Sequence, residues 1–231
     1  MMVSENSMSS ARLIVLEMLA QSILSISSAR TVLVGIDGVD GAGKTILADE
    51  LAEIISPSNR PVIRASVDGF HNPRALRYRL GRSSPQGFFR DSYNYSRLKA
   101  VLLDPLGPHG SGRFQRAVFD VETDTMLNLA VEQERPKSIL LFDGIFLHRH
   151  ELRAYWDFSI FLRLEWDRNH RIRHRPPEDF GPGDPRNIRY REGQNLYFRE
   201  CRPWEHATVV VDNDDIQEPF IVSSRTASRK S

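Results

Sequence analysis

The sequence is poor in cysteine, in net charge and in long apolar runs. Its only cysteine among 231 residues is Cys201, which excludes an intramolecular disulfide and a Cys-x-x-Cys metal site and is typical of a reducing compartment. The formal net charge of +1 is too small for a broad nucleic-acid surface. No apolar run is long enough to cross a bilayer. We therefore expect a cytoplasmic protein whose partners include neither nucleic acid nor a membrane.

The chain has the length and composition of one α/β domain. With 231 residues, 40% of them hydrophobic and 26% charged, it can bury a substantial core and has no disordered or fibrous signature. Residues 1–28 contain an amphipathic helix pattern over 9–27. Because this pattern lacks a dense Lys/Arg face, we expect a helix that covers the core and not a membrane anchor. Residues 29–222 should form the domain, and 223–231 a polar tail.

The most informative stretch is 32–50, VLVGIDGVDGAGKTILADE, where an apolar run breaks into a glycine-rich turn and continues as a helix pattern. It fits G-x-x-x-x-G-K-[ST], and it lies between a strand pattern and apolar residues at helical spacing, as that motif requires. Backbone N–H groups in such a loop, together with the helix N-terminus, bind phosphate oxygens. We expect the phosphates of a nucleotide to be held by Gly38, Asp40, Gly41, Ala42, Gly43, Lys44, Thr45 and Ile46.

Two aspartates follow apolar strand patterns. Asp68 comes after the pattern at 61–66, and Asp143 after the pattern at 138–142. Because the carboxyl ends of parallel strands meet at one edge of a sheet, both should lie beside the phosphate loop. Asp143 and Thr45 would then hold Mg²⁺, as a Walker-B acid and a phosphate-loop hydroxyl do. Asp68 is either the base that takes a proton from an acceptor hydroxyl, which we favour, a ligand of a Mg²⁺-bound water, or a helix N-cap.

Two arginine-rich segments are also present. Between 72 and 125, arginines alternate with aromatic residues, which indicates either a helical insertion with a solvated basic face or a substrate-binding subdomain. Residues 165–186 combine an arginine-dense helix pattern with a Pro/Gly-rich loop, and we interpret them as a lid over phosphates. His170 and His174 in this segment have the spacing of metal ligands, but the surrounding arginines disfavour a cation.

The patterns together predict a P-loop NTPase fold of the α/β class, with a parallel five-stranded sheet flanked by helices, a substrate-binding insertion and an arginine-rich lid. The strands are expected at 31–36, 61–66, 138–142, 156–164 and 207–211. One strand of a small hairpin is expected at 113–120, after a glycine-rich turn. The residues expected at this edge of the sheet suit phosphoryl transfer, because they can neutralise the charge of the transferred phosphate. They are Lys44, Thr45 with Mg²⁺, Asp143 and the arginines of the lid.

Several blocks of the sequence resemble the uridine kinase branch of the P-loop nucleoside kinases, particularly its bacterial members. They are GIDGVDGAGKT, SVDGFH, RDSYNY, ILLFDGIF, RYREGQNLYF and VVVDN, and they lie between residues 29 and 219. The resemblance implies ATP and Mg²⁺ as cofactors and the 5′-hydroxyl of uridine or a related nucleoside as the acceptor. It assigns Asp68 as the catalytic base and Asp91 to the ribose hydroxyls. The lid residues Arg171 and Arg173 would contact the triphosphate.

The predicted site therefore combines residues from the whole chain. Catalysis is assigned to Asp68, Lys44, Arg171 and Arg173. Acceptor binding is assigned to Asp68, Phe70, His71, Arg74, Tyr78, Asp91 and Phe119. The sequence differs from the uridine-cytidine kinases at two positions that contact the pyrimidine in those enzymes. Phe119 replaces a tyrosine, and Asp124 lies near the position of a histidine. Asp143 also stands where those enzymes usually have glutamate.

These departures keep other functions open. Pantothenate kinases and phosphoribulokinases share the same core, so pantothenate or a sugar phosphate is the alternative type of acceptor. A nucleotide-binding regulator that signals through a partner is the alternative outside the kinases. Against it, the sequence contains neither the N-K-x-D motif nor the L-S-G-G-Q signature. The oligomeric state is open, and a homo-oligomer is compatible with the sequence.

Overall fold

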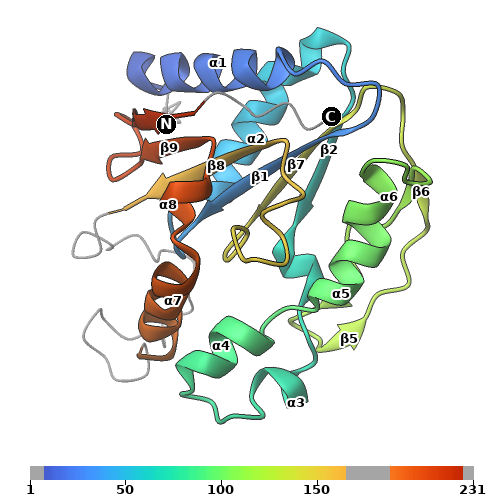
Figure 1. The fold of residues 1–231 in the computed structure, drawn as a ribbon, viewed down its shortest axis with the longest axis vertical. Helices are drawn as coiled ribbons and strands as arrows, with labels where there is room; N and C mark the ends of the chain where they lie inside the picture. The colour runs from blue at the N-terminus through green and yellow to red at the C-terminus, as the bar shows by residue number, and fades with distance from the viewer. Residues whose placement is uncertain (1–7, 165–187, 226–231) are drawn as a thin grey trace, which may run out of the picture.

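The computed structural model describes residues 8–164 and 188–225 of the chain (Figure 1). Their central element is a six-stranded sheet with the strand order β10-β9-β8-β1-β7-β2. The strands are β1 (Val32–Gly38), β2 (Val62–Ser66), β7 (Ile139–Gly144), β8 (Phe158–Arg163), β9 (Val209–Asp212) and β10 (Phe220–Ser224). All neighbours pair in parallel except β10, which is antiparallel to β9. The predicted parallel sheet of five strands is confirmed, and β10 is an additional edge strand.

Helices flank the sheet and fill its connections. The longer ones are α1 (Ser10–Leu24), α2 (Lys44–Ile55) and α7 (Ile188–Cys201). The shorter helical elements are η1 (Ser56–Ser58), η2 (Val67–Phe70), α3 (Arg74–Arg77), α4 (Pro85–Asp91), α5 (Tyr95–Leu98), the π-helix η3 (Lys99–Leu103), α6 (Asp104–Leu106) and α8 (Pro203–His206). The short strands β3 (Arg113–Phe114), β4 (Phe119–Asp120), β5 (Thr125–Met126) and β6 (Glu132–Gln133) lie outside the main sheet.

The edge strand β10 extends into the segment that the sequence indicated as a polar tail. Ser223 pairs with Val210 of β9, and Ser224 pairs with Val209. Without β10, the backbone N–H and C=O groups along this edge of β9 would lack partners. The polar composition of the segment concealed the strand, because an edge strand is held by main-chain hydrogen bonds and does not need buried side chains on both faces. The expected tail from residue 223 is therefore corrected, since its first two residues belong to the sheet.

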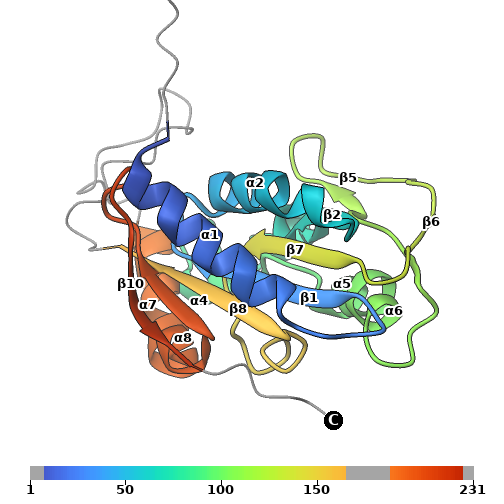
Figure 2. The same cartoon turned by 90° about the horizontal axis from the view of Figure 1, so that it is seen from above.

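One face of the sheet is covered by α1 and α2, as Figures 1 and 2 both show. Leu16, Leu19 and Ile23 of α1 are buried in the same cluster as Leu47 and Leu51 of α2. The central strands β1 and β7 are buried along their whole length, as expected for parallel strands whose two faces are both covered. The helix expected near the N-terminus thus packs on the core. Within the described ranges, no helix combines the length and the apolarity needed to span a membrane.

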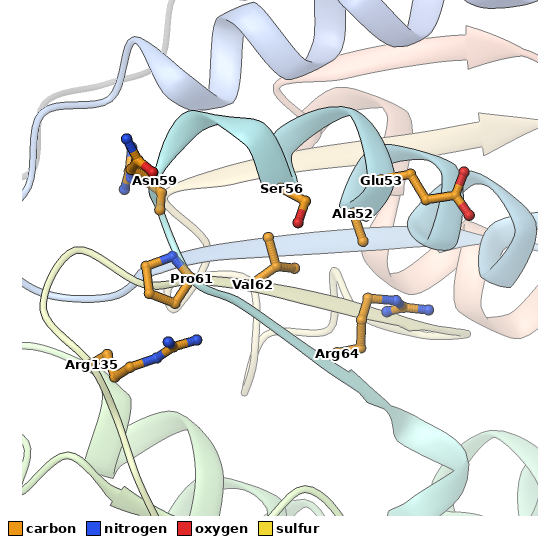
Figure 3. Close-up of a pocket in the computed structure, with 9 residues that line it drawn as sticks. Ala52, Glu53, Ser56, Asn59, Pro61, Val62, Arg64 and Arg135 are labelled. Atoms are coloured by element: carbon orange, nitrogen blue, oxygen red, sulfur yellow. The ribbon is translucent and has the colours of Figure 1, made fainter.

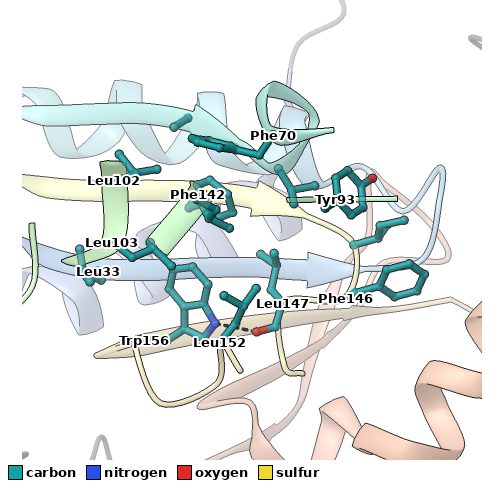
Figure 4. Packing of buried hydrophobic residues seen from close by; sticks show 14 of the residues in the cluster. Leu33, Phe70, Tyr93, Leu102, Leu103, Phe142, Phe146, Leu147, Leu152 and Trp156 are labelled. Carbon is teal, nitrogen blue, oxygen red and sulfur yellow. Dashed lines mark hydrogen bonds between the residues drawn. The ribbon is translucent and has the colours of Figure 1, made fainter. Parts of the chain in front are cut away.

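The opposite face of the sheet carries an aromatic-rich core. Phe142 of β7 stacks on Trp156 with ring centroids 5.7 Å apart, and the Phe70 ring lies 6.3 Å from Phe142 (Figure 4). Trp156 donates its indole N–H to the Leu147 carbonyl at 2.8 Å. A Cβ on Gly35 of β1 would lie only 2.7 Å from the indole ring, so the close approach of Trp156 to the sheet requires glycine there. This packing holds the segment after β2 against β7.

The segment 72–125 folds as short helices and two-residue strands. The single hairpin strand expected at 113–120 is divided in the structure into β3, which pairs with β6, and β4, which forms a small hairpin with β5. Asp120 at the end of β4 accepts hydrogen bonds from the Glu122 backbone N–H and the Thr123 hydroxyl, both at 2.9 Å. These bonds close a turn that directs β4 to β5. The sequence indicated the turn residues of this region but not the pairing partners.

Candidate active site

The loop between β1 and α2 has the geometry that phosphate binding requires. β1 ends at Gly38, and α2 begins at Lys44. Gly41 and Gly43 have φ angles of 74° and 82°, in the left-handed region that favours glycine. The Lys44 ammonium donates to the Val39 carbonyl of the same loop at 2.7 Å. Backbone N–H groups and a lysine at a helix N-terminus together form an anion-binding site.

Three neighbouring strands bring the predicted catalytic residues to one edge of the sheet. β7 lies between β1 and β2, and Asp143 is in register with Ile36 of β1 and with Ser66 of β2. The phosphate loop starts at Gly38, just beyond Ile36, and Asp68 follows shortly after Ser66. The loop, Asp143 and Asp68 therefore meet at the carboxyl ends of the strands, where ligands bind in open α/β sheets.

Asp143 and Thr45 form the pair that we expect to hold Mg²⁺. The Thr45 hydroxyl donates to Asp143 Oδ2 at 2.8 Å, and Asp143 is 2% exposed. Asp143 Oδ1 accepts from Arg64 Nη2 at 3.0 Å, and Arg64 is also paired with Asp49 at 2.9 Å. Hydroxyl and carboxylate oxygens are the hard ligands that Mg²⁺ prefers, so the residues present fit the ion. Arg64 was not predicted as a site residue, because its position inside β2 does not indicate that its side chain reaches Asp143 on the neighbouring strand β7.

Asp68 lies on η2, directly after β2. The Ser66 hydroxyl caps η2 and Pro73 occupies the N-cap position of α3, so Asp68 caps neither helix. Its carboxylate accepts from the Tyr93 hydroxyl at 3.2 Å. Solvent reaches the side chain, yet the surrounding protein removes enough water to raise the pKa of this carboxyl above its usual value. The positive charges of protonated His71 and of Lys44 act in the opposite direction and lower this pKa. These properties are typical of a general base.

Tyr93 and His71 complete the surroundings of Asp68. An isolated β-bridge joins the backbones of His71 and Tyr93, and their rings meet edge to face with centroids 4.5 Å apart. His71 Nδ1 lies 2.9 Å from the Asp68 carbonyl oxygen. Burial lowers the pKa of His71 and raises the pKa of Tyr93 well above its ordinary value, so near neutral pH the imidazole is neutral and the phenol protonated. Tyr93 was missed as a site residue, because only its contact with Asp68 distinguishes it from the other aromatic residues of the insertion.

Several residues predicted to bind the acceptor are engaged within the protein. Phe70 and Phe119 are 0% and 3% exposed and belong to the aromatic-rich core, so they support the site from beneath and do not line it. Their burial is evidence against the assignment as acceptor contacts, which stays a prediction. Asp91 is buried, and its two carboxylate oxygens accept from Arg79 Nε and Nη2 at 3.0 and 3.1 Å. The acid assigned to ribose hydroxyls is therefore already bound by an arginine.

Tyr78 of the insertion is a packing surface for guanidinium groups. The Arg189 guanidinium of α7 lies 4.7 Å from the centre of the Tyr78 ring, and those of Arg77 and Arg82 lie 5.5 and 5.6 Å away. Arg189 is buried and donates to the Arg77 carbonyl at 3.1 Å. Tyr78 thus joins the insertion to α7. Arg74, in contrast, is exposed at the start of α3.

The predicted lid, residues 165–186, lies outside the described residues. The same holds for Arg171 and Arg173, so their roles at the triphosphate stay predictions. The described chain resumes with α7, which packs beside α4, and the rings of Tyr190 and Phe88 meet there with centroids 4.9 Å apart. The insertion and the helix after the lid segment are therefore in direct contact.

A buried polar network beneath the phosphate loop was not predicted. Asp37, the residue before Gly38 in β1, is 0% exposed and accepts from His148 Nδ1 at 2.7 Å and from the Tyr197 hydroxyl. Its other oxygen accepts from the Gly38 backbone N–H at 2.7 Å. His148 Nε2 lies 3.0 Å from Ser159 Oγ. The network joins β1, β8 and α7 and fixes the entry to the loop. The sequence feature that could have indicated this network is Asp37, a charged residue inside an otherwise apolar strand pattern.

An open cavity of about 570 Å³ lies beside this site, between the end of α2, the start of β2 and Arg135 (Figure 3). Arg64 lines it and also reaches Asp143 at 3.0 Å. In the described part of the chain, the lining of this cavity includes neither the phosphate loop nor Asp68. The cavity therefore borders the candidate active site but does not contain the groups suited to phosphoryl transfer.

Comparisons with known proteins bear on the fold. No family model matches the sequence, and no curated protein matches it significantly. A protein from Bacillus stearothermophilus, described as a possible uridine kinase, has a TM-score of 0.67 and 24% identity over 84% of this chain and 96% of its own. A protein from Silicibacter sp. TM1040, described provisionally as a fructose transport system kinase, has a TM-score of 0.58 and 22% identity over 83% and 94%.

A more distant match is the D-glycerate 3-kinase from Cryptococcus neoformans, with a TM-score of 0.55 and 13% identity over 91% of this chain and 98% of its own. These structures differ in the substrates that their descriptions name, while they share one arrangement of sheet and helices. At such low identities the similarity carries over only the architecture. The chain has the α/β fold of P-loop kinase structures, with a mainly parallel sheet flanked by helices.

Proposed function

We propose that the protein is a kinase that transfers the γ-phosphate of ATP to a hydroxyl group of a small molecule. The observation that carries the proposal is the position of Asp68, whose carboxylate follows β2 at the edge of the sheet where the phosphate loop and Asp143 also lie. Nucleotide binding alone requires no such carboxylate, whereas transfer to a hydroxyl benefits from a base beside the phosphate loop. The similarity in fold to structures described as kinases supports the proposal.

In the proposed reaction, Asp68 takes the proton of the acceptor hydroxyl while the hydroxyl oxygen forms a bond to the γ-phosphorus. The bond between the γ-phosphorus and the β,γ-bridging oxygen breaks, and ADP leaves. Lys44 offsets the negative charge that develops on the phosphate oxygens. Thr45 and Asp143 would hold Mg²⁺, which supplies further charge neutralisation at the phosphates when bound. The lid arginines are proposed to close over the triphosphate from the other side.

The first candidate acceptor is the 5′-hydroxyl of uridine or a related nucleoside. The sequence blocks that resemble uridine kinases support it, as does the similarity in fold to a possible uridine kinase. One observation favours the second candidate class, pantothenate or a sugar or sugar phosphate. Asp91, which would have to bind ribose hydroxyls, is buried and occupied by Arg79. A nucleoside would have to displace Arg79 or bind in a different way.

The test is an acceptor panel with the purified full-length protein and Mg-ATP. The panel comprises nucleosides, pantothenate, sugars and sugar phosphates, and both ADP and the phosphorylated product are quantified. We expect ADP formation to depend on one class of acceptor and to equal product formation. ATP hydrolysis that is the same with and without every acceptor would contradict the kinase proposal and indicate a nucleotide-binding regulator.

A further inference from the structure

Asn213 contacts the phosphate loop from the end of β9, which is separated from β1 by β8 in the sheet. It is 1% exposed, and its Nδ2 donates to the Ala42 carbonyl at 2.7 Å. Its backbone N–H donates to the Arg163 carbonyl at 3.0 Å, which holds it between β8 and β9. The two partners in the loop contact, Asn213 and Ala42, are 171 residues apart in sequence. The sheet therefore holds the Asn213 side chain in a fixed position against the glycine-rich phosphate loop.

This hydrogen bond sets the direction of one N–H group in the loop. Because a peptide unit is planar and trans, the Gly43 N–H points opposite to the Ala42 carbonyl. The carbonyl is held toward Asn213, so the N–H points away from Asn213. Among the residues that the structure describes, this N–H has no hydrogen-bond partner. It is therefore available to a phosphate oxygen, which is how such loops bind anions.

The alternative orientation of this peptide is accessible to the loop without Asn213. Gly43 has a φ of 82° and no side chain, so rotation of the preceding peptide meets little steric resistance. A Cβ on Gly43 would lie 3.0 Å from Asn213 Nδ2, which shows how closely the asparagine approaches the loop. The side chain of Asn213 thus selects one of two orientations that the glycine leaves open.

Arg12 of α1 holds the Asn213 amide in the required orientation. It is 2% exposed, and its Nη1 donates to the Ile216 carbonyl at 2.8 Å and lies 3.5 Å from Asn213 Oδ1. Its Nε donates to both carboxylate oxygens of Glu50 on α2, each at 3.0 Å. A guanidinium beside Oδ1 disfavours the amide flip that would turn Oδ1 toward the Ala42 carbonyl oxygen. The helix α1 is in this way connected to the phosphate loop.

We propose that Asn213 is a positioning residue for the phosphates of the nucleotide and that Arg12 acts through it. The inference rests on one part of the proposed function, namely that the loop at 38–45 binds ATP. It adds a role for α1, which the sequence placed outside the kinase domain. Loss of Asn213 should weaken nucleotide binding without affecting the acceptor, because the group that it orients belongs to the phosphate loop.

The test measures binding of Mg-ATP and of Mg-ADP by calorimetry, with full-length protein and no acceptor. Asn213→Leu preserves the size of the side chain and removes its donor. We expect the Kd for both nucleotides to rise about tenfold, which corresponds to about 1.4 kcal/mol. In the kinase assay the KM for ATP should rise while the KM for the acceptor stays unchanged. Asn213→Ala provides the same comparison if Asn213→Leu does not fold.

Two further variants separate positioning from stability. Arg12→Met should weaken nucleotide binding less than Asn213→Ala, and the double variant should bind as Asn213→Ala does, because Arg12 acts through Asn213. Arg30→Met is the matched control. Arg30 pairs with Asp157 at 2.7 Å at the opposite end of β1 from the loop, so its loss should lower the Tm and leave nucleotide affinity unchanged.

The outcomes distinguish this inference from the proposed function. Unchanged nucleotide affinity in both Asn213 variants overturns the inference and leaves the kinase proposal intact. Wild-type protein that binds nucleotide but phosphorylates no acceptor overturns the kinase proposal alone. Wild-type protein that binds neither Mg-ATP nor Mg-ADP overturns both.

Discussion

The nucleotide side and the acceptor side of the candidate site are built in different ways. On the nucleotide side, Lys44 and Asp143 are placed by a helix start and a strand end in the centre of the sheet. On the acceptor side, the insertion presents side chains whose availability depends on ion pairs, such as Arg79 with Asp91 at 3.0 Å. The backbone defines the first site, and the rotamers of long side chains define the second.

This difference predicts how readily each side can change. A strand end is fixed by the register of buried strands, so altering it would disturb the whole sheet. The Arg79 side chain is 57% exposed, and an ion pair with so exposed a partner contributes little to stability and can open for a ligand. We infer that the positions of Lys44 and Asp143 are determined by the fold, whereas the choice of acceptor is determined by a few side chains of the insertion.

The largest effect is expected where the two sides meet, at Asp68. Asp68→Asn should lower kcat by about 10²- to 10⁴-fold, because an amide cannot take the proton of the acceptor hydroxyl. The Kd for Mg-ATP should stay unchanged, since the phosphate loop is intact. Asp120→Asn, which removes a turn carboxylate of the insertion, should leave turnover unchanged. Steady-state kinetics with the acceptor found in the panel, combined with calorimetry, would measure both quantities.

The stability of the Asp68 variant provides an independent check. The folded-state pKa of Asp68 is raised above the unfolded value because burial disfavours the charged form. The stability gained from this shift is present below the unfolded pKa and is lost as pH rises through the folded pKa. Neutral pH lies above the unfolded pKa, so the wild type has lost part of this contribution, and Asp68→Asn, which carries no charge to desolvate, should raise the Tm. A lower Tm at neutral pH would mean that the fold stabilises the carboxylate, against the desolvation seen here.

The sequence predicted the nucleotide side because its parts are local or lie at strand ends. The strand, glycine loop and helix are contiguous in 32–50, and two apolar runs followed by aspartate indicated neighbouring parallel strands. The structure confirms the sheet and brings Thr45 within 2.8 Å of Asp143. Their joint role in binding Mg²⁺ stays a prediction. The edge strand β10 was not predicted, because main-chain hydrogen bonds hold it and its side chains do not form a buried apolar pattern.

The acceptor side could not be predicted in the same way. Alternating arginines and aromatic residues do not reveal whether a given arginine faces an acid, a ring or solvent. Asp91 is paired with an arginine 12 residues away, and Tyr78 contacts Arg189 from a helix beyond the lid segment. The contact of Asn213 with the loop at Ala42 spans 171 residues. Such pairs depend on tertiary packing, which a single sequence does not encode in any local pattern.

A smaller effect, on acceptor choice, is expected from Arg79→Met. The substitution releases both carboxylate oxygens of Asp91 while keeping a long side chain. If a ribonucleoside is the acceptor, its vicinal hydroxyls can then bind Asp91 without displacing a guanidinium. The KM for uridine should fall a few-fold relative to that for 2′-deoxyuridine, as expected for about one net hydrogen bond. Paired KM measurements for the two nucleosides give this ratio.

The control for this comparison is Arg77→Met, which breaks the pair with Asp124 at 3.1 Å and should leave the ratio of the two KM values unchanged. If Arg79→Met lowers the Tm and the ratio does not move, Asp91 is a structural residue. The acceptor is then bound elsewhere on the insertion, and the second candidate class of acceptors is favoured.

The smallest effect is expected from Tyr93→Phe, which keeps the proposed base Asp68 but changes its pKa. The Tyr93 hydroxyl donates to Asp68 Oδ1 at 3.2 Å, and this bond lowers the pKa of Asp68 because it favours the carboxylate. Without the bond, the raised pKa of Asp68 should rise further. Since the base must be deprotonated, the acidic limb of the pH profile of kcat/KM should move to higher pH, with little change at alkaline pH.

The matched control for this shift is Tyr95→Phe. The Tyr95 hydroxyl accepts from Arg149 at 3.3 Å and makes no bond to Asp68, so the limb should stay in place. Tyr93 itself adds no titration in this range, because its pKa is raised well above the ordinary value. A limb that stays fixed in Tyr93→Phe, or moves to lower pH, would mean that the rate is not controlled by the proton of Asp68. The two sides of the site would then not meet at this carboxylate, and the base would have to be sought among the side chains of the insertion.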